Sequence, residues 1–230
     1  MQYGSSTEPA ELFAPDLGTR ALARGGLWGD LWKSFFDRLV AVIALLILFP
    51  LMATVAVAIL ISDGRPIFFG HARVGRYGRV FHCLKFRTMV RDAEDRLQTL
   101  LASDPVARRE WESHRKLRHD PRVLPFGGLL RKLSIDELPQ FLNVLRGDMS
   151  LVGPRPITAE ELGGYGANAA AYMSVRPGVT GLWQVSGRSG LEFSDRVRLD
   201  MAYVATRSFL GDLRIILRTP LVVLRGSGAC

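Results

Sequence analysis

The sequence contains little cysteine, and its histidines lack the spacing of a metal motif. Only Cys83 and Cys230 occur among 230 residues, one in an apolar stretch and the other at the end. This usage argues against a disulfide framework and a thiol-rich metal site, and it fits a reducing, cytoplasmic setting. The histidines at 71, 82, 114 and 119 show no ligand spacing, so no metal is assigned to them.

Acidic residues are also in the minority, with 22 Asp and Glu against 30 Lys and Arg, a formal net charge of +8. The imbalance predicts anionic partners, and phosphorylated substrates, nucleic acid and anionic lipid headgroups all qualify. A hydrophobic content of 48% allows one sizeable domain, with or without an appendage. Residues 1–30 are rich in small residues and proline without periodicity, which predicts a flexible leader.

Charge is wholly missing from Leu39 to Ile61, a continuous apolar run of membrane-segment length. The run begins too late and is too long for a cleavable signal peptide. A buried soluble helix usually keeps some polar face, and this run shows almost none. We therefore predict a membrane helix over residues 31–62.

Pro50 lies at the midpoint of this run and predicts a kink or break. A straight helix of this length extends about 34 Å and crosses a bilayer, whereas two halves of about 16 Å each dip in and return. Both arrangements remain open on length. Basic residues flank the run on both sides, which suits a re-entrant segment: Arg20, Arg24, Lys33 and Arg38 before it, and Arg65, Arg73, Arg76 and Arg79 after it.

The remainder predicts a mixed domain over residues 63–230. Short β-prone stretches at 67–69 and 80–84 predict a small hairpin. Helical periodicity at 91–118 is divided at Asp104-Pro105, and further helices are expected at 136–145, 158–173 and 192–208. The tail from Leu213 to Arg225 mixes arginines with aliphatics. It predicts either an amphipathic helix on a membrane surface or a final core helix.

Two adjacent carboxylates, Asp136 and Glu137, stand at a predicted helix start after the basic residues Arg131 and Lys132. If that start faces a phosphate, the pair performs reaction chemistry. The structural alternative is a capping box formed by Ser134 and Glu137. Acidic residues are also common in a first helical turn because the helix dipole favours them there.

Three further motifs each carry a cation: KFRTM (85–89), GDMSLVGPRP (147–156) and RPGVTGLWQVSGR (176–188). The arginine fork suits phosphate oxygens, and glycine-rich turns aim backbone N–H groups at anions. Any one motif is better explained as an ordinary turn. Their occurrence together behind a membrane segment indicates a phosphate site.

In this order, KFRTM, DELPQ (136–140) with Asn143, GDMSLVGPRP and RPGVTGLWQVSGR resemble the bacterial sugar transferases, which are monotopic polyprenyl-phosphate phosphoglycosyl transferases. The match runs from about residue 33 to the C-terminus, and GHARVG (70–75) looks like members that begin exopolysaccharide units. The resemblance implies an α+β, mainly helical fold: a small membrane-associated catalytic domain with a re-entrant helix broken near Pro50 and a small β-hairpin. It also implies a bacterial inner (plasma) membrane location, with the catalytic domain on the cytoplasmic face.

The resemblance implies transfer of a hexose-1-phosphate from a UDP-sugar to undecaprenyl phosphate, with release of UMP; UDP-galactose or UDP-glucose is the expected donor. Asp136 maps to the family's nucleophile, which forms a covalent phosphosugar intermediate, and Glu137 to its Mg²⁺-associated carboxylate. The dipole of the expected helix would keep Asp136 ionised. Membrane lipids are expected partners, and the oligomeric state is left open, with a homo-oligomer allowed.

Five cationic residues are expected at the substrates. The resemblance places Arg131, Arg155 and Arg188 near the phosphates or the uridine. Lys85 and Arg87 belong to a family motif and are expected to contact substrate, or else to tie the core to Asp148 or to lipid headgroups.

Single features of the sequence also suggest two other functions. The basic balance suggests a membrane-tethered nucleic-acid binder, but no basic stripe or fold signature of such a module is present, so nucleic acid is not an expected partner. The tail suggests a noncatalytic membrane scaffold. Neither alternative accounts for the motif set.

Overall fold

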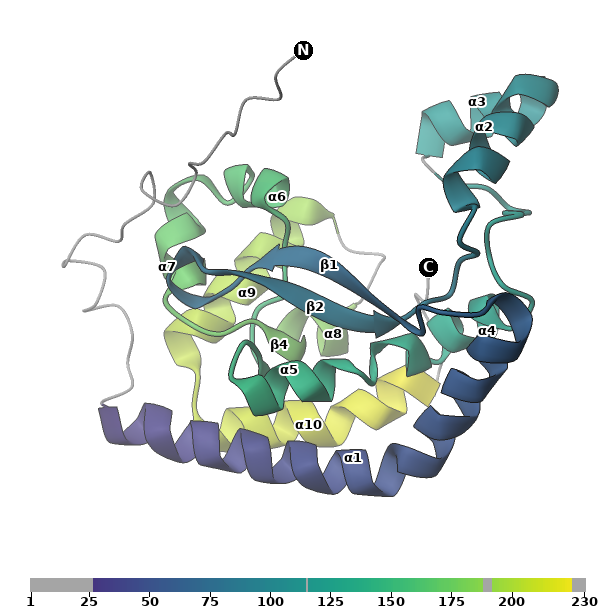
Figure 1. The fold of residues 1–230 in the computed structure, drawn as a ribbon. Coiled ribbons are helices and arrows are strands. Elements are labelled where there is room, and N and C mark those ends of the chain that lie inside the picture. The colour runs from purple at the N-terminus through teal and green to yellow at the C-terminus, as the bar shows by residue number, and fades with distance from the viewer. Residues whose placement is uncertain (1–26, 115, 188–191, 225–230) are drawn as a thin grey trace, which may run out of the picture.

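The computed structural model describes residues 27–114, 116–187 and 192–224. The chain is mainly helical, with a long N-terminal helix beneath the rest of the molecule and a twisted hairpin across it (Figure 1). The predicted leader lies almost entirely outside the described residues. The α+β, mainly helical prediction is confirmed.

The long helix α1 spans Leu27–Asp63 and contains Pro50. It starts at Leu27 rather than at 31, and Figure 1 shows that it changes direction partway along. Proline removes a helical hydrogen bond, and the Thr54 hydroxyl donates to the Pro50 carbonyl at 2.9 Å, so we attribute the bend to this turn. The helix is long and apolar enough to cross a membrane, and little of its most apolar stretch is buried within the chain.

The two parts of α1 pack on different clusters. Before Pro50, Ala41 joins the largest core cluster with residues such as Val144 and Leu151. After Pro50, Val55 and Ile59 pack with Phe86 and a few neighbours in a separate cluster. The bend therefore lets one helix support both ends of the domain.

The predicted hairpin is confirmed. Strand β1 (Phe68–Val74) pairs antiparallel with β2 (Val80–Phe86) around the short turn η3 (Arg76–Gly78). The predicted division at Asp104 is confirmed too: α2 (Ala93–Ser103) is followed by α3 (Pro105–His114), and the Asp104 side chain accepts from Val106 N. Figure 1 shows this helical pair projecting away from the rest of the domain.

The predicted helix from Asp136 to Leu145 and the capping box before it are wrong. After α4 (Gly127–Lys132), the acidic pair lies in a single 3-10 turn, η4 (Ile135–Glu137), and a separate helix α5 (Gln140–Arg146) begins after Pro139. Ser134 has the left-handed φ of 55° and makes no side-chain cap. Gly147 ends α5 with φ 87°, as expected.

A two-stranded parallel sheet was not predicted. Strand β3 (Ser150–Val152) pairs with β4 (Gly178–Thr180), which joins the two glycine-rich motifs side by side. A Cβ on Gly178 would lie 2.1 Å from the Gly153 nitrogen, so only glycine permits this approach.

The C-terminal half is helical, and the helix expected at 158–173 is broken. It consists of α6 (Ala159–Gly163), η5 (Gly166–Asn168) and α7 (Ala169–Met173). A capping box does occur here, between Thr158 and Glu161. The short α8 (Leu182–Ser186) follows β4, and α9 (Phe193–Thr206) matches the helix expected at 192–208.

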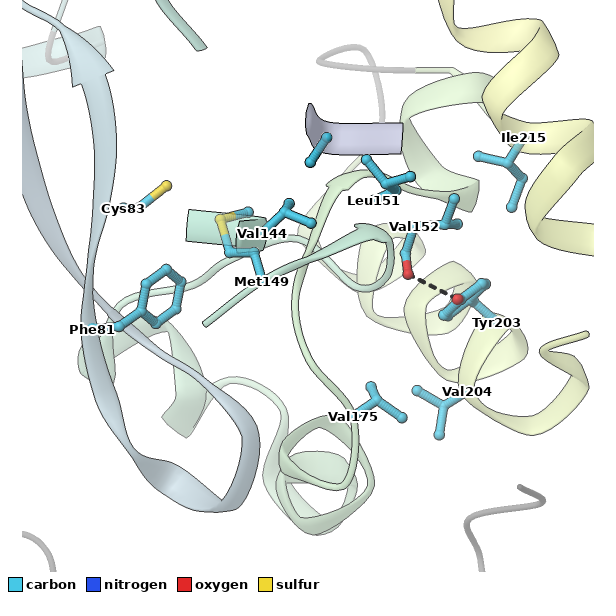
Figure 2. Close-up of a cluster of buried hydrophobic side chains, with 11 residues drawn as sticks. Phe81, Cys83, Val144, Met149, Leu151, Val152, Val175, Tyr203, Val204 and Ile215 are labelled. Atoms are coloured by element: carbon cyan, nitrogen blue, oxygen red, sulfur yellow. Dashed lines mark hydrogen bonds between the residues drawn. The ribbon is translucent and has the colours of Figure 1, made fainter. Parts of the chain in front are cut away.

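The final helix, α10 (Phe209–Leu224), packs on the core as one of the two alternatives predicted, and it also leaves apolar side chains exposed. Ile215 is buried in the largest core cluster, whereas Phe209, Leu210, Leu217 and Leu221 are exposed. The same cluster holds the β3 residues Leu151 and Val152, and the Tyr203 hydroxyl donates to the Val152 carbonyl at 2.9 Å (Figure 2).

Candidate active site

The main cleft has a volume of about 1050 Å³ and is bordered by the acidic pair. Two carboxylates and a larger number of cations line it, so it suits an anionic ligand. The cationic residues along its walls are Lys85, Arg87, Arg91, Lys116, Arg131, Arg155 and Arg196.

The acidic pair reaches the cleft through the tight turn at Ser134. This residue has a left-handed backbone between α4 and η4, and Asp136, two residues later, is 7% exposed. Strand β2 packs against η4. The pair is therefore held by a compact turn against a strand rather than by the end of a long helix.

Asn143 fixes β2 beside this turn. Its side-chain amide is fully buried, accepts from Leu84 N at 2.9 Å and donates to the His82 carbonyl at 2.9 Å. These two bonds join α5 to β2 directly next to Lys85. Sequence reasoning included Asn143 in a motif without a role, and the structure shows it clamping the strand that carries Lys85.

Lys85 lies against both carboxylates. Its Nζ is 2.6 Å from Glu137 Oε1 and 3.7 Å from Asp136 Oδ2. Burial opposes the charge on Lys85, but Glu137 and Asp136 together raise its pKa, so the ammonium stays charged. The expectation that Lys85 ties the core to Asp148 is wrong, because its partners are these two carboxylates.

Burial raises the pKa of Asp136 to about 6; Lys85 lowers it and Glu137 raises it. The helix whose dipole was expected to keep Asp136 ionised is absent, because η4 is one short turn, and burial outweighs the nearby cations. Near pH 7 the carboxylate is ionised but incompletely solvated, a state that suits a nucleophile.

Arg131 lines the cleft next to Asp136. Its Nε donates to Thr88 Oγ1 at 2.8 Å, which orients the guanidinium from the KFRTM segment, and its charge lowers the pKa of Asp136. The structure therefore brings Arg131 and Lys85 to the acidic pair.

Arg87 lines the same cleft, but its guanidinium is paired with groups at the end of α1. Its Nη1 lies 2.7 Å from Asp63 Oδ2, and its Nη2 donates to the Gly64 carbonyl at 2.7 Å. Its partner is thus Asp63 and not Asp148. The pairing ties the end of α1 to the strand β2, which leads into the candidate site.

Arg155 follows β3 and stacks on Trp183 from the next motif. Its guanidinium carbon is 5.1 Å from the ring centroid, and that of Arg196 is 5.6 Å away. The Tyr172 hydroxyl holds the Arg155 segment, 3.0 Å from its carbonyl oxygen. Arg188 lies outside the described residues. Sequence reasoning quoted Trp183 and Gln184 but gave them no role, although both line the cleft.

Comparison with known proteins identifies the family. The family model described as bacterial sugar transferase matches residues 28–226. The chain belongs to this family.

Three relatives are informative. The exopolysaccharide production protein ExoY of Sinorhizobium fredii is 49% identical over 201 residues, 86% of this chain and 89% of the relative. The undecaprenyl-phosphate galactose phosphotransferase of Salmonella typhimurium is 47% identical over 197 residues, which are 86% of this chain and 41% of the relative. The UDP-glucose:undecaprenyl-phosphate glucose-1-phosphate transferase of Xanthomonas campestris is 37% identical over 215 residues, 88% of this chain and 42% of the relative.

This sugar transferase offers few ligand groups for a metal. Within the described part of the chain, no three His, Cys, Asp or Glu side chains come together as a metal site. Two adjacent carboxylates beside a cationic cleft still fit Mg²⁺, which prefers hard oxygen ligands and keeps several waters or phosphate oxygens. Glu137 is the more accessible of the pair, with a side chain 33% exposed.

Proposed function

We propose that this protein transfers a hexose-1-phosphate from a UDP-sugar to undecaprenyl phosphate and releases UMP, and so starts synthesis of a lipid-linked exopolysaccharide or related glycan. The observation that carries the proposal is Asp136, a buried carboxylate at a large cationic cleft, 3.7 Å from Lys85. The names of the Salmonella and Xanthomonas relatives support the same reaction class.

In the first step, a carboxylate oxygen of Asp136 bonds to the sugar-linked phosphorus, and the bond from that phosphorus to the oxygen of UMP breaks. UMP leaves with that oxygen and its electron pair. In the second step, a phosphate oxygen of undecaprenyl phosphate attacks the same phosphorus, and the Asp136 carboxylate is released. Covalent catalysis replaces one transfer between two anions by two displacements at a fixed position.

The cations beside Asp136 have defined tasks in this scheme. Lys85 and Arg131 are the cations whose charges lower the pKa of Asp136, and they stabilise negative charge on the transferred phosphoryl group. Arg155, held against Trp183, contacts the diphosphate or the uridine. Arg87 and Arg188 remain predicted substrate contacts, Arg87 being paired with Asp63 and Arg188 lying outside the described residues.

Mg²⁺ is the proposed cofactor, with Glu137 as its ligand. When bound, it would neutralise charge on the donor diphosphate. Lys85 already contacts Glu137 at 2.6 Å, so Lys85 and a bound Mg²⁺ would share this carboxylate. The side chain of Glu137 can serve both because a carboxylate offers several lone pairs.

The proposed membrane arrangement is a re-entrant α1 at the bacterial inner membrane, with the catalytic domain on the cytoplasmic face. The bend at Pro50 separates two apolar halves, and Leu46, Ile47 and Ile61 are each more than 70% exposed. Exposed apolar residues of α10 extend the lipid-facing surface. Undecaprenyl phosphate would then reach the cleft from the bilayer surface.

The experiment is a UMP-release assay with purified protein, undecaprenyl phosphate, Mg²⁺ and a panel of UDP-sugars that includes UDP-galactose and UDP-glucose. We expect UMP release with one of these donors, formation of a lipid diphosphate sugar, and loss of both in EDTA. A folded protein that releases no UMP from any UDP-sugar would contradict the proposal and favour a noncatalytic scaffold.

A further inference from the structure

A second cavity of about 170 Å³ adjoins the main cleft, and we call it the side chamber. Both cavities are lined by Lys85, Glu137 and Arg155 and by the pair Trp183 and Gln184, whereas Asp136 lines only the main cleft. The Lys85–Glu137 ion pair therefore lies at the boundary between the two cavities. Its own walls include His71, Arg73 and Gln140.

The two cavities differ in the charge that they offer. The main cleft is strongly cationic, whereas the polar groups confined to the side chamber are largely neutral or already paired. Arg73 is 3.0 Å from Glu161, and Gln140 is a neutral amide. Burial and the neighbouring Arg73 lower the pKa of His71, so its imidazole is neutral near pH 7. The side chamber therefore suits an uncharged polar group.

Two wall residues hold buried polar atoms that lack partners. Trp183 Nε1, a donor, and Gln184 Oε1, an acceptor, have no hydrogen-bond partner among the described residues. The Gln184 amide nitrogen donates to the Val179 carbonyl at 3.0 Å, which fixes the side chain in place. A hydroxyl group both donates and accepts, so it is a suitable partner for either atom.

We propose that the side chamber binds the sugar ring of the donor and that Gln184 and His71 recognise its hydroxyl groups; the inference rests on the proposed transferase function. Lys85 Nζ lies 3.7 Å from Asp136 and also lines the side chamber. The reacting phosphorus must lie at Asp136, and the sugar is one bridging oxygen from it. The nucleoside is separated from the reacting phosphorus by the second phosphate and would occupy the larger main cleft.

The uracil ring is the competing occupant, because amide side chains also pair with its edge. The two assignments predict different kinetics. Replacing a residue that recognises sugar hydroxyl groups changes the ratio of kcat/KM between epimeric UDP-hexoses and leaves inhibition by UMP unchanged. A residue that reads uracil weakens UMP inhibition and affects every donor equally.

The test uses Gln184→Met and His71→Asn, with Gln98→Met as the matched control. Gln98 is on α2, its side-chain amide donates to Glu94 at 2.8 Å, and it lines neither cavity. His71 is exposed on β1, so its replacement leaves the fold intact. Melting temperature confirms folding for each variant.

We expect Gln184→Met and His71→Asn to change the ratio of kcat/KM between UDP-galactose and UDP-glucose by about tenfold, with the UMP inhibition constant within twofold of the wild type. Gln98→Met should match the wild type in both. An unchanged ratio in the folded variants, or weakened UMP inhibition with equal losses for both donors, would overturn the sugar assignment. Absence of wild-type turnover with any UDP-sugar would instead reject the proposed function.

Discussion

The ammonium of Lys85 lies 2.6 Å from Glu137 and joins the two carboxylates of the active site, because Asp136 is only 3.7 Å from the same nitrogen. Two neighbouring carboxylates repel each other and favour protonation of one of them. A shared cation reduces that repulsion without neutralising either group. The Asn143 amide, which clamps β2 to α5, holds this cation in place.

Asp136 costs the protein stability. The pKa of Asp136 is about 6 in the folded protein, against 3.8 for an ordinary aspartate. Protonation of Asp136 therefore stabilises the folded state relative to the ionised form; this stabilisation is complete below pH 4 and is lost as the pH rises through 6. Asp136→Asn should therefore abolish UMP release yet stabilise the folded state at pH 7.5 by up to about 3 kcal/mol.

The measurement is the melting temperature of both proteins in EDTA between pH 4 and 8. The advantage of Asp136→Asn should grow with pH and level off above 7. A variant that is less stable than the wild type at pH 7.5 would show that burial does not strain this carboxylate.

Lys85→Met should raise the pH at which the stabilisation from protonated Asp136 is lost. Lys85 lowers the pKa of Asp136, so its removal raises that pKa and moves the loss of stability to higher pH. The comparison is between Lys85→Met and the double variant with Asp136→Asn, melted in EDTA over the same pH range. An unchanged midpoint would mean that the two groups are uncoupled in solution.

Arg87→Met should destabilise the protein by up to about 3 kcal/mol, because Asp63 then keeps only Arg91, whose backbone N–H donates to the carboxylate at 3.0 Å and whose Nε lies 3.8 Å away. Replacing Asp63 by Leu in the same chain should restore much of the stability. Denaturant titration in detergent measures both. If Arg87→Met keeps full stability and loses only substrate affinity, the guanidinium contacts substrate and does not link β2 to the end of α1.

Pro50→Ala should convert the proposed re-entrant arrangement of α1 into a spanning helix, because the straightened apolar run of about 34 Å is long enough to cross. Single cysteines at Leu31 and Ser62, in a Cys230→Ser background, report topology with a membrane-impermeant maleimide. Burial raises the pKa of the Cys83 thiol to about 11, so it should not react.

With Pro50 present, neither cysteine should react from outside intact spheroplasts, and both should react after lysis. With Pro50→Ala, one of the two should become reactive from outside. Reaction of either position from outside in the parent chain would contradict the re-entrant arrangement.

Local patterns predicted the hairpin, α1, α9 and the division at Asp104, because each depends on residues close in sequence. The predicted helix start at Asp136 was wrong, and the reason is also local. Ser134 adopts a left-handed backbone, and Pro139 restarts the helix, so the expected continuous helix became two elements. Proline at this position was the available indication that a helix begins after it.

Long-range features could not be predicted from the sequence. The parallel pair of β3 and β4 joins three-residue strands too short to give a pattern, and only this pairing brings Arg155 onto Trp183. The partner of Arg87 depends on where α1 ends relative to β2. The raised pKa of Asp136 depends on burial, which the motif does not encode.

The most direct test of the central claim is the intact mass of the enzyme after incubation with a UDP-hexose and Mg²⁺ in the absence of undecaprenyl phosphate. The account predicts one UMP released per active enzyme and a mass increase of one hexosyl phosphate, located by peptide mapping at Asp136 and removed when undecaprenyl phosphate is added. UMP release that requires both substrates, with an enzyme that never gains mass, would contradict it.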